Sequence, residues 1–226
     1  MRYALKNNYP GIIEKSGCSC GGNQMLLQSS TLRRFGCGAV AALDLLRYLH
    51  LYHIDCQSDL FSGIPDKHAL PFELYSLCVQ RITHSYVPIL PHLATNGVFL
   101  SAGLNAYFRH YGLPLRAYWG TSQDELWPSV SRMLQSDIPV ILGIGKSIKH
   151  LPGVKRLDLY RKEGGEFKAV RQVSGHFLTI LGQDDEWLYV SSWGREYAVN
   201  RWELMHYART ESASFLCSIL QIFPKF

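Results

Sequence analysis

Apolar residues follow a helical spacing in the first part of the chain. Val40, Leu43, Leu46 and Leu49 recur at intervals of three, which predicts a buried helix from about residue 37 to residue 51. Further helices are predicted over residues 71–83, 101–111 and 122–135, and a capping box of serine and glutamate opens the last of them. Residues 1–30 mix glycines with polar residues and predict irregular structure.

The pattern changes after Asp137, where short extended runs replace the helical spacing. A buried strand is predicted at residues 139–143, and Gly164-Gly165 separates two runs of a hairpin, 156–162 and 167–173. More strands are predicted at residues 176–181, 187–191, 197–199 and 214–223, with a short helix near 202–207. Helices followed by an antiparallel sheet indicate an α+β fold. We expect one domain over residues 1–226, with a helical part (about 30–136) meeting a sheet part (about 137–226) along a cleft.

Composition excludes several classes of protein. The 226 residues are 47% hydrophobic and 18% charged, which suits a folded core rather than disorder. The net charge of +5 is mild, and the most basic stretch, residues 146–171, also holds acidic residues, so no nucleic-acid partner is predicted. No apolar run approaches the roughly 20 residues of a membrane span. The first residues lack a signal-peptide pattern, so we expect a cytoplasmic protein whose six cysteines are mostly free thiols.

Two residues far apart in the sequence suggest chemistry. Cys37 begins the predicted central helix between Gly36 and Gly38, where unpaired N–H groups and the helix dipole favour a thiolate and the glycines let a substrate backbone approach. His176 follows Gly175 at the mouth of a strand, from which it can project into a cleft. Gly175, like the glycines beside Cys37, is a candidate substrate-binding residue. Alone, the cysteine also fits a small buried residue and the histidine a strand end. The pair is meaningful only if the fold brings the two together.

Residues 35–42 and 175–182 together resemble the C39-like branch of papain-type cysteine peptidases, which includes bacterial bacteriocin-processing peptidases. Residues 191–194, Ser-Ser-Trp-Gly, resemble the Asn-Ser-Trp-Gly of papain-like enzymes. The resemblance implies a papain-like fold, in which a helix bearing the cysteine packs on an antiparallel sheet. It also implies Cys37 as nucleophile, His176 as base, a Trp193 ring that shields the histidine, a peptide or protein substrate, and no cofactor or metal.

This sequence departs from that family in the groups that support the pair. Ser191 stands where the family has the Asn or Asp that orients the histidine. Either Ser191 orients it, or Asp184 or Asp185 does, or peptidase activity has been lost. The family's oxyanion-hole glutamine is matched by Gln24 or Gln28, whereas its usual spacing from the cysteine falls on Thr31.

The function expected is hydrolysis of a peptide or amide bond by Cys–His acyl transfer. Two alternatives stay open: a transglutaminase-like acyl transferase, and a catalytically silent domain that binds peptides. An unrelated α+β fold in which Cys37 and His176 never meet is a third. Metal binding by Cys18 and Cys20 is disfavoured because no second pair of Cys or His lies nearby. His50, His53 and Cys56 fall at intervals of three at the end of the first long helix and fit a solvated helix end better than a metal site.

Overall fold

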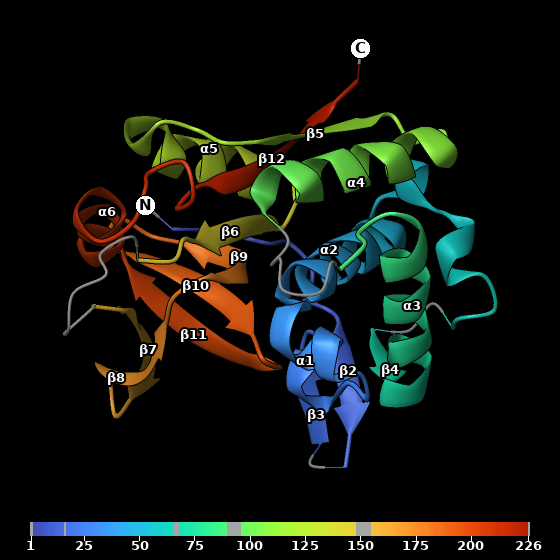
Figure 1. Ribbon diagram of the computed structural model, residues 1–226, viewed down its shortest axis with the longest axis horizontal. Helices are drawn as coiled ribbons and strands as arrows, with labels where there is room; N and C mark the ends of the chain where they lie inside the picture. Colours follow the sequence, from blue (N-terminus) through green and yellow to red (C-terminus); the bar gives the residue numbers. More distant parts are fainter. Residues whose placement is uncertain (1, 16, 66–67, 90–95, 148–154, 226) are drawn as a thin grey trace.

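A strongly twisted antiparallel sheet and a buried helix laid against it organise the molecule (Figure 1). The computed structural model describes the chain except residues 1, 16, 66–67, 90–95, 148–154 and 226. The helices in the described residues are α1 (Ser30–Phe35), α2 (Cys37–Tyr52), α3 (Phe72–Ser85), α4 (Gly97–His110), α5 (Gln123–Gln135) and α6 (Arg201–Thr210), with short 3₁₀ turns η1 (Gln24–Leu26), η2 (Ile54–Cys56) and η3 (Asp59–Phe61).

The large sheet is antiparallel throughout and runs in the order β5-β12-β6-β9-β10-β11-β7-β8, with β1 pairing on β9. The expected α+β class is therefore confirmed. The predicted division into a helical part (30–136) and a sheet part (137–226) holds only approximately. Strand β5 lies within the first range, and helix α6 lies within the second. The strands of this sheet are β1 (Tyr3–Ala4), β5 (Leu115–Trp119), β6 (Val140–Ile144), β7 (Leu157–Glu163), β8 (Glu166–Val173), β9 (His176–Gln183), β10 (Trp187–Ser192), β11 (Arg195–Asn200) and β12 (Ile219–Pro224).

The N-terminal region is more regular than predicted. β2 (Gly11–Glu14), β3 (Gly17–Cys20) and β4 (Ala69–Pro71) form a second, smaller sheet in the order β3-β2-β4. All three strands are short, and β2 (Gly-Ile-Ile-Glu) and β3 (Gly-Cys-Ser-Cys) lack the alternation of apolar and polar residues that marks a strand. The prediction of irregular structure over residues 1–30 is therefore wrong for β2 and β3.

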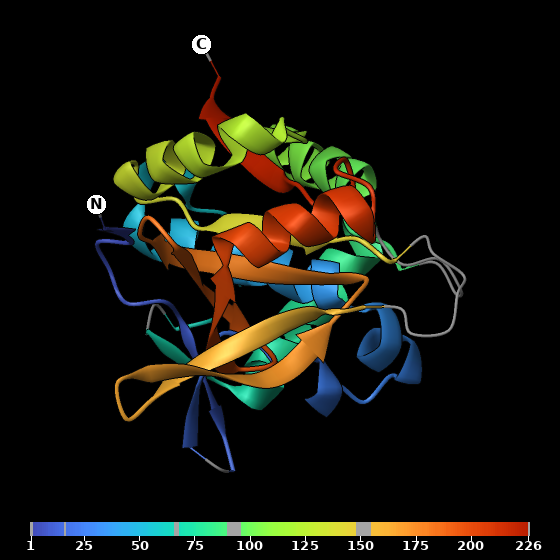
Figure 2. The ribbon, with the colours of Figure 1, turned by 90° about the vertical axis from the view of Figure 1, so that its left-hand side faces the viewer.

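The central helix α2 is buried along almost its whole length, from Cys37 to Leu49. It packs on β9 and β6 on one side and on α3 and α4 on the other (Figure 1). A helix that is apolar around its whole circumference needs such cover on every side. α6 packs against strands β7 and β11, and in Figure 2 this helix (red) lies above the β7–β8 hairpin (yellow to orange).

Glycine is required where α1 passes directly into α2. A Cβ atom at Gly36 would lie 2.4 Å from the carbonyl oxygen of Leu32, the atom that accepts a hydrogen bond from the Gly36 N–H. The tight junction fixes Cys37 in the first turn of α2.

Most predicted helices and strands are confirmed to within a few residues. Larger shifts occur in α4, which begins at Gly97 rather than residue 101, and in β12, which begins at Ile219 rather than residue 214. The basic stretch 146–171 lies partly outside the described residues. Among the described residues, no helix is both long enough and apolar enough to cross a membrane.

A buried carboxylate ties the N-terminus and α2 to the segment that precedes β6. Asp137 accepts hydrogen bonds from the Lys6 N–H at 2.7 Å, the Asn7 side chain at 2.8 Å and the Tyr48 hydroxyl at 2.5 Å. Its backbone is left-handed, with φ of 58°. Aspartate adopts this conformation more readily than most residues.

Asp137→Ala is expected to destabilise the fold by about 3 kcal/mol, because several buried donors lose their acceptor and alanine is strained at positive φ. Urea unfolding measures this change. Glu166→Ala, at an exposed position in the β7–β8 hairpin, should change stability by less than about 0.5 kcal/mol. Equal effects of the two substitutions would show that Asp137 is not an anchor of the fold.

Candidate active site

Cys37 and His176 line one small cavity between the N-terminus of α2 and the start of β9. Its volume is about 10 Å³, which is room for about one water molecule. Each of the two side chains is only 8% exposed. The fold thus brings together the two residues on which the sequence hypothesis depends. The remaining lining residues are Gly22, Gln24, Val40, Ala41, Asp44, Phe177, Thr179, Ser191, Ser192 and Trp193.

The Cys37 sulfur lies among backbone donors. N–H groups of Phe177, Gly38 and Cys37 itself hydrogen-bond to it and lower its pKa. Two of these belong to the first turn of α2, where N–H groups have no partner within the helix. Burial acts in the opposite direction and is the larger effect, so the pKa of Cys37 is raised overall. The net shift is opposite to the one expected from the helix terminus alone, and the resting thiol is protonated at neutral pH.

His176 is held on two sides. Its Nε2 atom hydrogen-bonds to the Ser192 hydroxyl at 2.8 Å, and its ring stacks on Trp193 with centroids 4.1 Å apart and planes 8° apart. Burial, and secondly the positive charge of Arg171, lower the pKa of His176 to about 3. The imidazole is therefore neutral at physiological pH and can accept a proton.

Ser192, and not Ser191, is the serine that contacts the imidazole. The Ser191 hydroxyl donates instead to the Cys20 carbonyl oxygen at 2.7 Å. The prediction that Ser191 orients His176 is therefore wrong by one residue. Adjacent side chains of a strand point to opposite faces. An error of one position in matching the family motif therefore assigns the contact with His176 to the wrong serine.

The acidic residues proposed as alternative partners of His176 lie elsewhere. The Asp184 carboxylate accepts hydrogen bonds from the Glu186 and Trp187 N–H groups and from the Tyr189 hydroxyl. It thereby builds the turn between β9 and β10. Neither Asp184 nor Asp185 lines the cavity.

Of the two candidate glutamines, the structure places Gln24 in the cavity and leaves Gln28 exposed. Gln24 is buried, and its Nε2 donates to the Arg33 carbonyl oxygen at 2.8 Å. An amide nitrogen carries two hydrogens, so this bond leaves a second donor for a ligand. Thr31, the position given by the usual family spacing, lies in α1 and does not line the cavity.

The flanking glycines proposed to bind substrate do not line the cavity. Gly36 and Gly38 are buried at the α1–α2 junction. Gly175 has a φ of +63°, and the Lys146 side chain covers it so closely that a Cβ atom there would lie 2.7 Å from Lys146 Cγ. These glycines shape the backbone on either side of the reactive pair.

Trp193 and Gly194 form the two-residue turn between β10 and β11, with φ values of 47° and 71°. Positive φ at both positions is the signature of a type I′ hairpin turn, in which a bulky residue is unusual. The Gly194 N–H donates to the Gly22 carbonyl at 3.1 Å, and the Cys20 N–H donates to the Gly194 carbonyl at 2.9 Å. These two hydrogen bonds hold the turn that carries Trp193 against the segment that precedes Gln24.

Asp44 is a cavity residue that the sequence reasoning missed. It lies on α2, about two helical turns beyond Cys37. Its carboxylate accepts from the Gly22 N–H and from the Tyr75 hydroxyl, both at 2.8 Å. Burial raises the pKa of Asp44 to about 7. The available signal was an aspartate inside a run of residues that are otherwise almost all apolar.

No metal-binding cluster accompanies this site. Among the described residues, no group of three His, Cys, Asp or Glu side chains is placed to hold a metal ion. His53 Nε2 is engaged with the Asp137 carbonyl at 2.9 Å, and His50 Nδ1 accepts from the Ser58 N–H at 3.2 Å. All six cysteines are free thiols, and Cys18 is exposed.

Comparison with known proteins assigns no relative: no protein-family model matches the sequence, and no curated protein matches it. The function is therefore inferred from the cavity itself. A thiol surrounded by N–H donors, a neutral imidazole and a buried amide are the groups that acyl transfer requires.

The raised pKa of Asp44 makes a prediction about stability. A carboxyl group with a pKa of about 7 when folded and about 3.9 when unfolded binds its proton more tightly in the folded state. Its contribution to stability is complete below pH 4 and is lost as the pH rises through 7. Asp44→Asn keeps an acceptor for the Gly22 N–H but cannot titrate.

Urea unfolding of both proteins between pH 4.5 and pH 7.5 measures this effect. The stability of Asp44→Asn relative to the wild type should increase as the pH rises. Groups common to both proteins, including His176, cancel in this difference. Parallel pH profiles would show that Asp44 titrates normally.

Proposed function

We propose that this protein is a cysteine peptidase or related thiol hydrolase of the papain-like type, with Cys37 as nucleophile and His176 as base. The single observation that carries the proposal is the convergence of the two side chains on one cavity, together with the Gln24 amide. The resemblance of residues 35–42 and 175–182 to C39-like peptidases supports it, as does the packing of α2, which begins at the cysteine, on strand β9, which begins at the histidine.

The protonation states of the site define the first step. The protonated thiol gives its proton to neutral His176 as the sulfur attacks the carbonyl carbon and a C–S bond forms. The carbonyl oxygen becomes an anion, for which the Cys37 N–H and the Gln24 amide are the candidate donors. These donors are most valuable at this stage because the negative charge is absent from the ground state.

The second half returns the proton. The His176 imidazolium protonates the leaving nitrogen as the C–N bond breaks, and the acyl group stays on Cys37 as a thioester. A water molecule that loses its proton to His176 then hydrolyses the thioester and regenerates the thiol. Ser192 keeps the ring oriented through both steps. A neutral hydroxyl stabilises the imidazolium less than a carboxylate would.

One observation favours a second candidate function. The cavity has room for about one water, and both reactive side chains are 8% exposed. A peptide held outside such a closed cavity would not reach the Cys37 thiol, which is the arrangement expected of a domain that binds peptides without cleaving them. Such a domain would bind peptides equally well with and without the Cys37 thiol.

Turnover of a complex peptide mixture, followed by mass spectrometry, separates these functions. The wild type is expected to generate new peptide termini, and Cys37→Ala should lower the rate at least about 10³-fold because the nucleophile is lost. Cys18→Ala, which removes an exposed thiol outside the cavity, should retain the wild-type rate. An added primary amine distinguishes acyl transfer from hydrolysis, because a transglutaminase-like enzyme would incorporate it.

Peptide binding without turnover, unchanged in Cys37→Ala, would replace the peptidase proposal with the binding function. Activity that survives in Cys37→Ala would exclude the proposed nucleophile.

The neighbouring serines provide a matched pair of variants. Ser192→Ala removes the hydrogen bond to His176 and is expected to lower kcat about 10-fold or more, because the base is no longer held in one orientation. Ser191→Ala removes a hydrogen bond to Cys20 and should mainly reduce stability, by about 1 kcal/mol. Steady-state kinetics and urea unfolding of both variants check this. A greater loss of kcat in Ser191→Ala would restore the assignment made from the sequence.

A further inference from the structure

An arginine, a tryptophan and the candidate base form one stack beside the cavity. The guanidinium carbon of Arg171, on β8, lies 3.8 Å from the centroid of the Trp193 ring. The same Trp193 ring stacks on His176 at 4.1 Å. Because Trp193 lines the cavity, Arg171 is separated from the candidate chemistry by a single aromatic ring.

Arg171 has hydrogen-bonding capacity to spare. Its side chain is exposed, and within the described parts of the chain no carboxylate pairs with it. Stacking on an aromatic ring occupies the face of a guanidinium and leaves its in-plane N–H donors available. These donors match the two oxygens of a carboxylate. Arg171 is therefore a charged group beside the site that has no acidic partner among the described residues.

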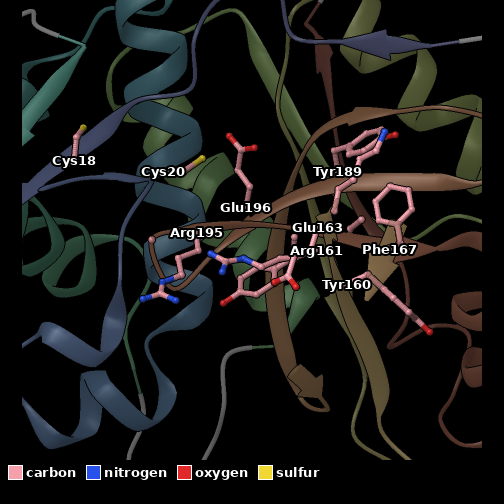
Figure 3. Close-up of a pocket in the computed structure, with 13 residues that line it drawn as sticks. Cys18, Cys20, Tyr160, Arg161, Glu163, Phe167, Tyr189, Arg195 and Glu196 are labelled. Atoms are coloured by element: carbon pink, nitrogen blue, oxygen red, sulfur yellow. The ribbon is translucent and has the colours of Figure 1, made fainter. Parts of the chain in front are cut away.

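The surroundings of the stack are also basic. Trp193 packs edge-on against Tyr197 at 6.2 Å, and Arg161 lies over the Tyr197 ring at 5.7 Å. Beyond the Trp193 turn lies a groove of about 540 Å³ lined by Arg161 and Arg195 among others (Figure 3). In the view of Figure 3 both arginine side chains extend toward the same end of this groove.

The groove also contains two glutamates, but neither neutralises Arg171. Glu163 lies 3.9 Å from Lys168. Glu196 acts on Cys20, whose pKa is raised to about 12 by burial and by this negative charge. Within the described residues, Arg171 is the cation whose charge acts on the pKa of His176.

The chemistry decides which part of a substrate meets Arg171. His176 protonates the leaving nitrogen, so the segment that leaves as an amine must lie beside the imidazole and along the edge of the Trp193 ring, whose two faces are covered by His176 and Arg171. The oxyanion donors, Gln24 and the Cys37 N–H, serve the acyl side. A group that reaches past Trp193 therefore belongs to the leaving segment.

We propose that Arg171 binds a carboxylate of the leaving segment, so that the enzyme prefers substrates that are anionic on the amine side of the scissile bond. This inference rests on the proposed function, because the leaving side is defined by the role of His176. The carboxylate has two possible sources: an Asp or Glu side chain just after the scissile bond, or the free C-terminus of a short leaving segment.

The proposal has a consequence for the rate as well as for binding. The charge of Arg171 lowers the pKa of His176 and so opposes the imidazolium that forms during the reaction. A bound carboxylate offsets this charge and favours the imidazolium. Among the described residues, other charged or titratable groups near His176 include Cys37 on α2, the buried Asp44 on the same helix, and Lys146, which covers Gly175. An anionic leaving segment should therefore raise kcat and lower KM.

Peptides of matched sequence test the inference. One carries Glu just after the scissile bond and an amidated C-terminus, a second replaces Glu by Gln, and a third combines Gln with a free C-terminal carboxylate. For the wild type, kcat/KM should be about 5- to 10-fold higher for at least one carboxylate peptide than for the neutral one. The peptide that shows the preference identifies the source.

Arg171→Gln should abolish the preference, whereas Arg116→Gln, at an exposed position on β5, should keep it. Arg171→Gln should also move the acidic limb of the pH profile of kcat/KM to higher pH with the neutral peptide, because His176 loses a nearby cation. Turnover without any carboxylate preference, or a preference unchanged in Arg171→Gln, would overturn the inference and leave the peptidase proposal intact.

Binding gives a readout that does not need turnover. Calorimetric titration of Cys37→Ala with the same peptides should show tighter binding of a carboxylate peptide, and this difference should disappear in Cys37→Ala/Arg171→Gln. Such binding, in a wild type that cleaves nothing, would keep the carboxylate site and reject the peptidase. Equal binding of all three peptides would overturn the carboxylate site.

Discussion

The packing of the N-terminus of α2 against the start of β9 is the contact on which the rest of the structure depends. Through it the Phe177 N–H reaches the Cys37 sulfur, and the residue before Phe177 is the candidate base. The contact is fixed from both sides. α1 and Gly36 set where α2 begins, and the pairing of β9 with β6 and β10 sets where β9 begins. Neither reactive side chain could be shifted without disturbing the core.

Charge in this site is controlled by burial more than by the helix terminus. The thiol of Cys37 and the imidazole of His176 are both neutral at rest, because removing either charge from water outweighs the donors around it. A site of this kind creates its charges only when a substrate is in place. The Trp193 ring and the small volume of the cavity keep water away from them at that moment.

The sequence predicted what periodicity and turn chemistry encode. The helix from Cys37 and the hairpin at Gly164-Gly165 were recognisable because their apolar spacing or turn residues are local signals. Strands β2 and β3 carry no such alternation, since a parallel neighbour far along the chain, β4, completes their sheet. A pairing between segments so far apart in the sequence cannot be predicted from the residues around either strand.

The site shows the same division. Cys37 and His176 were recognised because their residue types, at a helix start and a strand start, are chemically informative, whereas Gln24 was a candidate only through the family resemblance. The assignment of Ser191 failed because the face of a strand depends on a register that only the fold reveals. Asp44 was hidden within the apolar run of α2. Arg171 was overlooked because it lies on an exposed strand, where an arginine is normally a solvated surface residue. Its stacking on the Trp193 ring, which sets it apart, is visible only in the structure.

The left-handed backbone conformation of Trp193 lowers the stability of the turn, while the Trp193 side chain covers the candidate base. Asparagine and glycine suit that position of a two-residue hairpin turn far better than an indole, so either would relax the turn. The relaxed hairpin would leave the imidazole open to water on the face that the indole now covers, and would remove the platform beneath the guanidinium. Replacing the indole to stabilise this turn would therefore disrupt the surroundings of His176, so thermal stability and the arrangement of the site make opposing demands on Trp193.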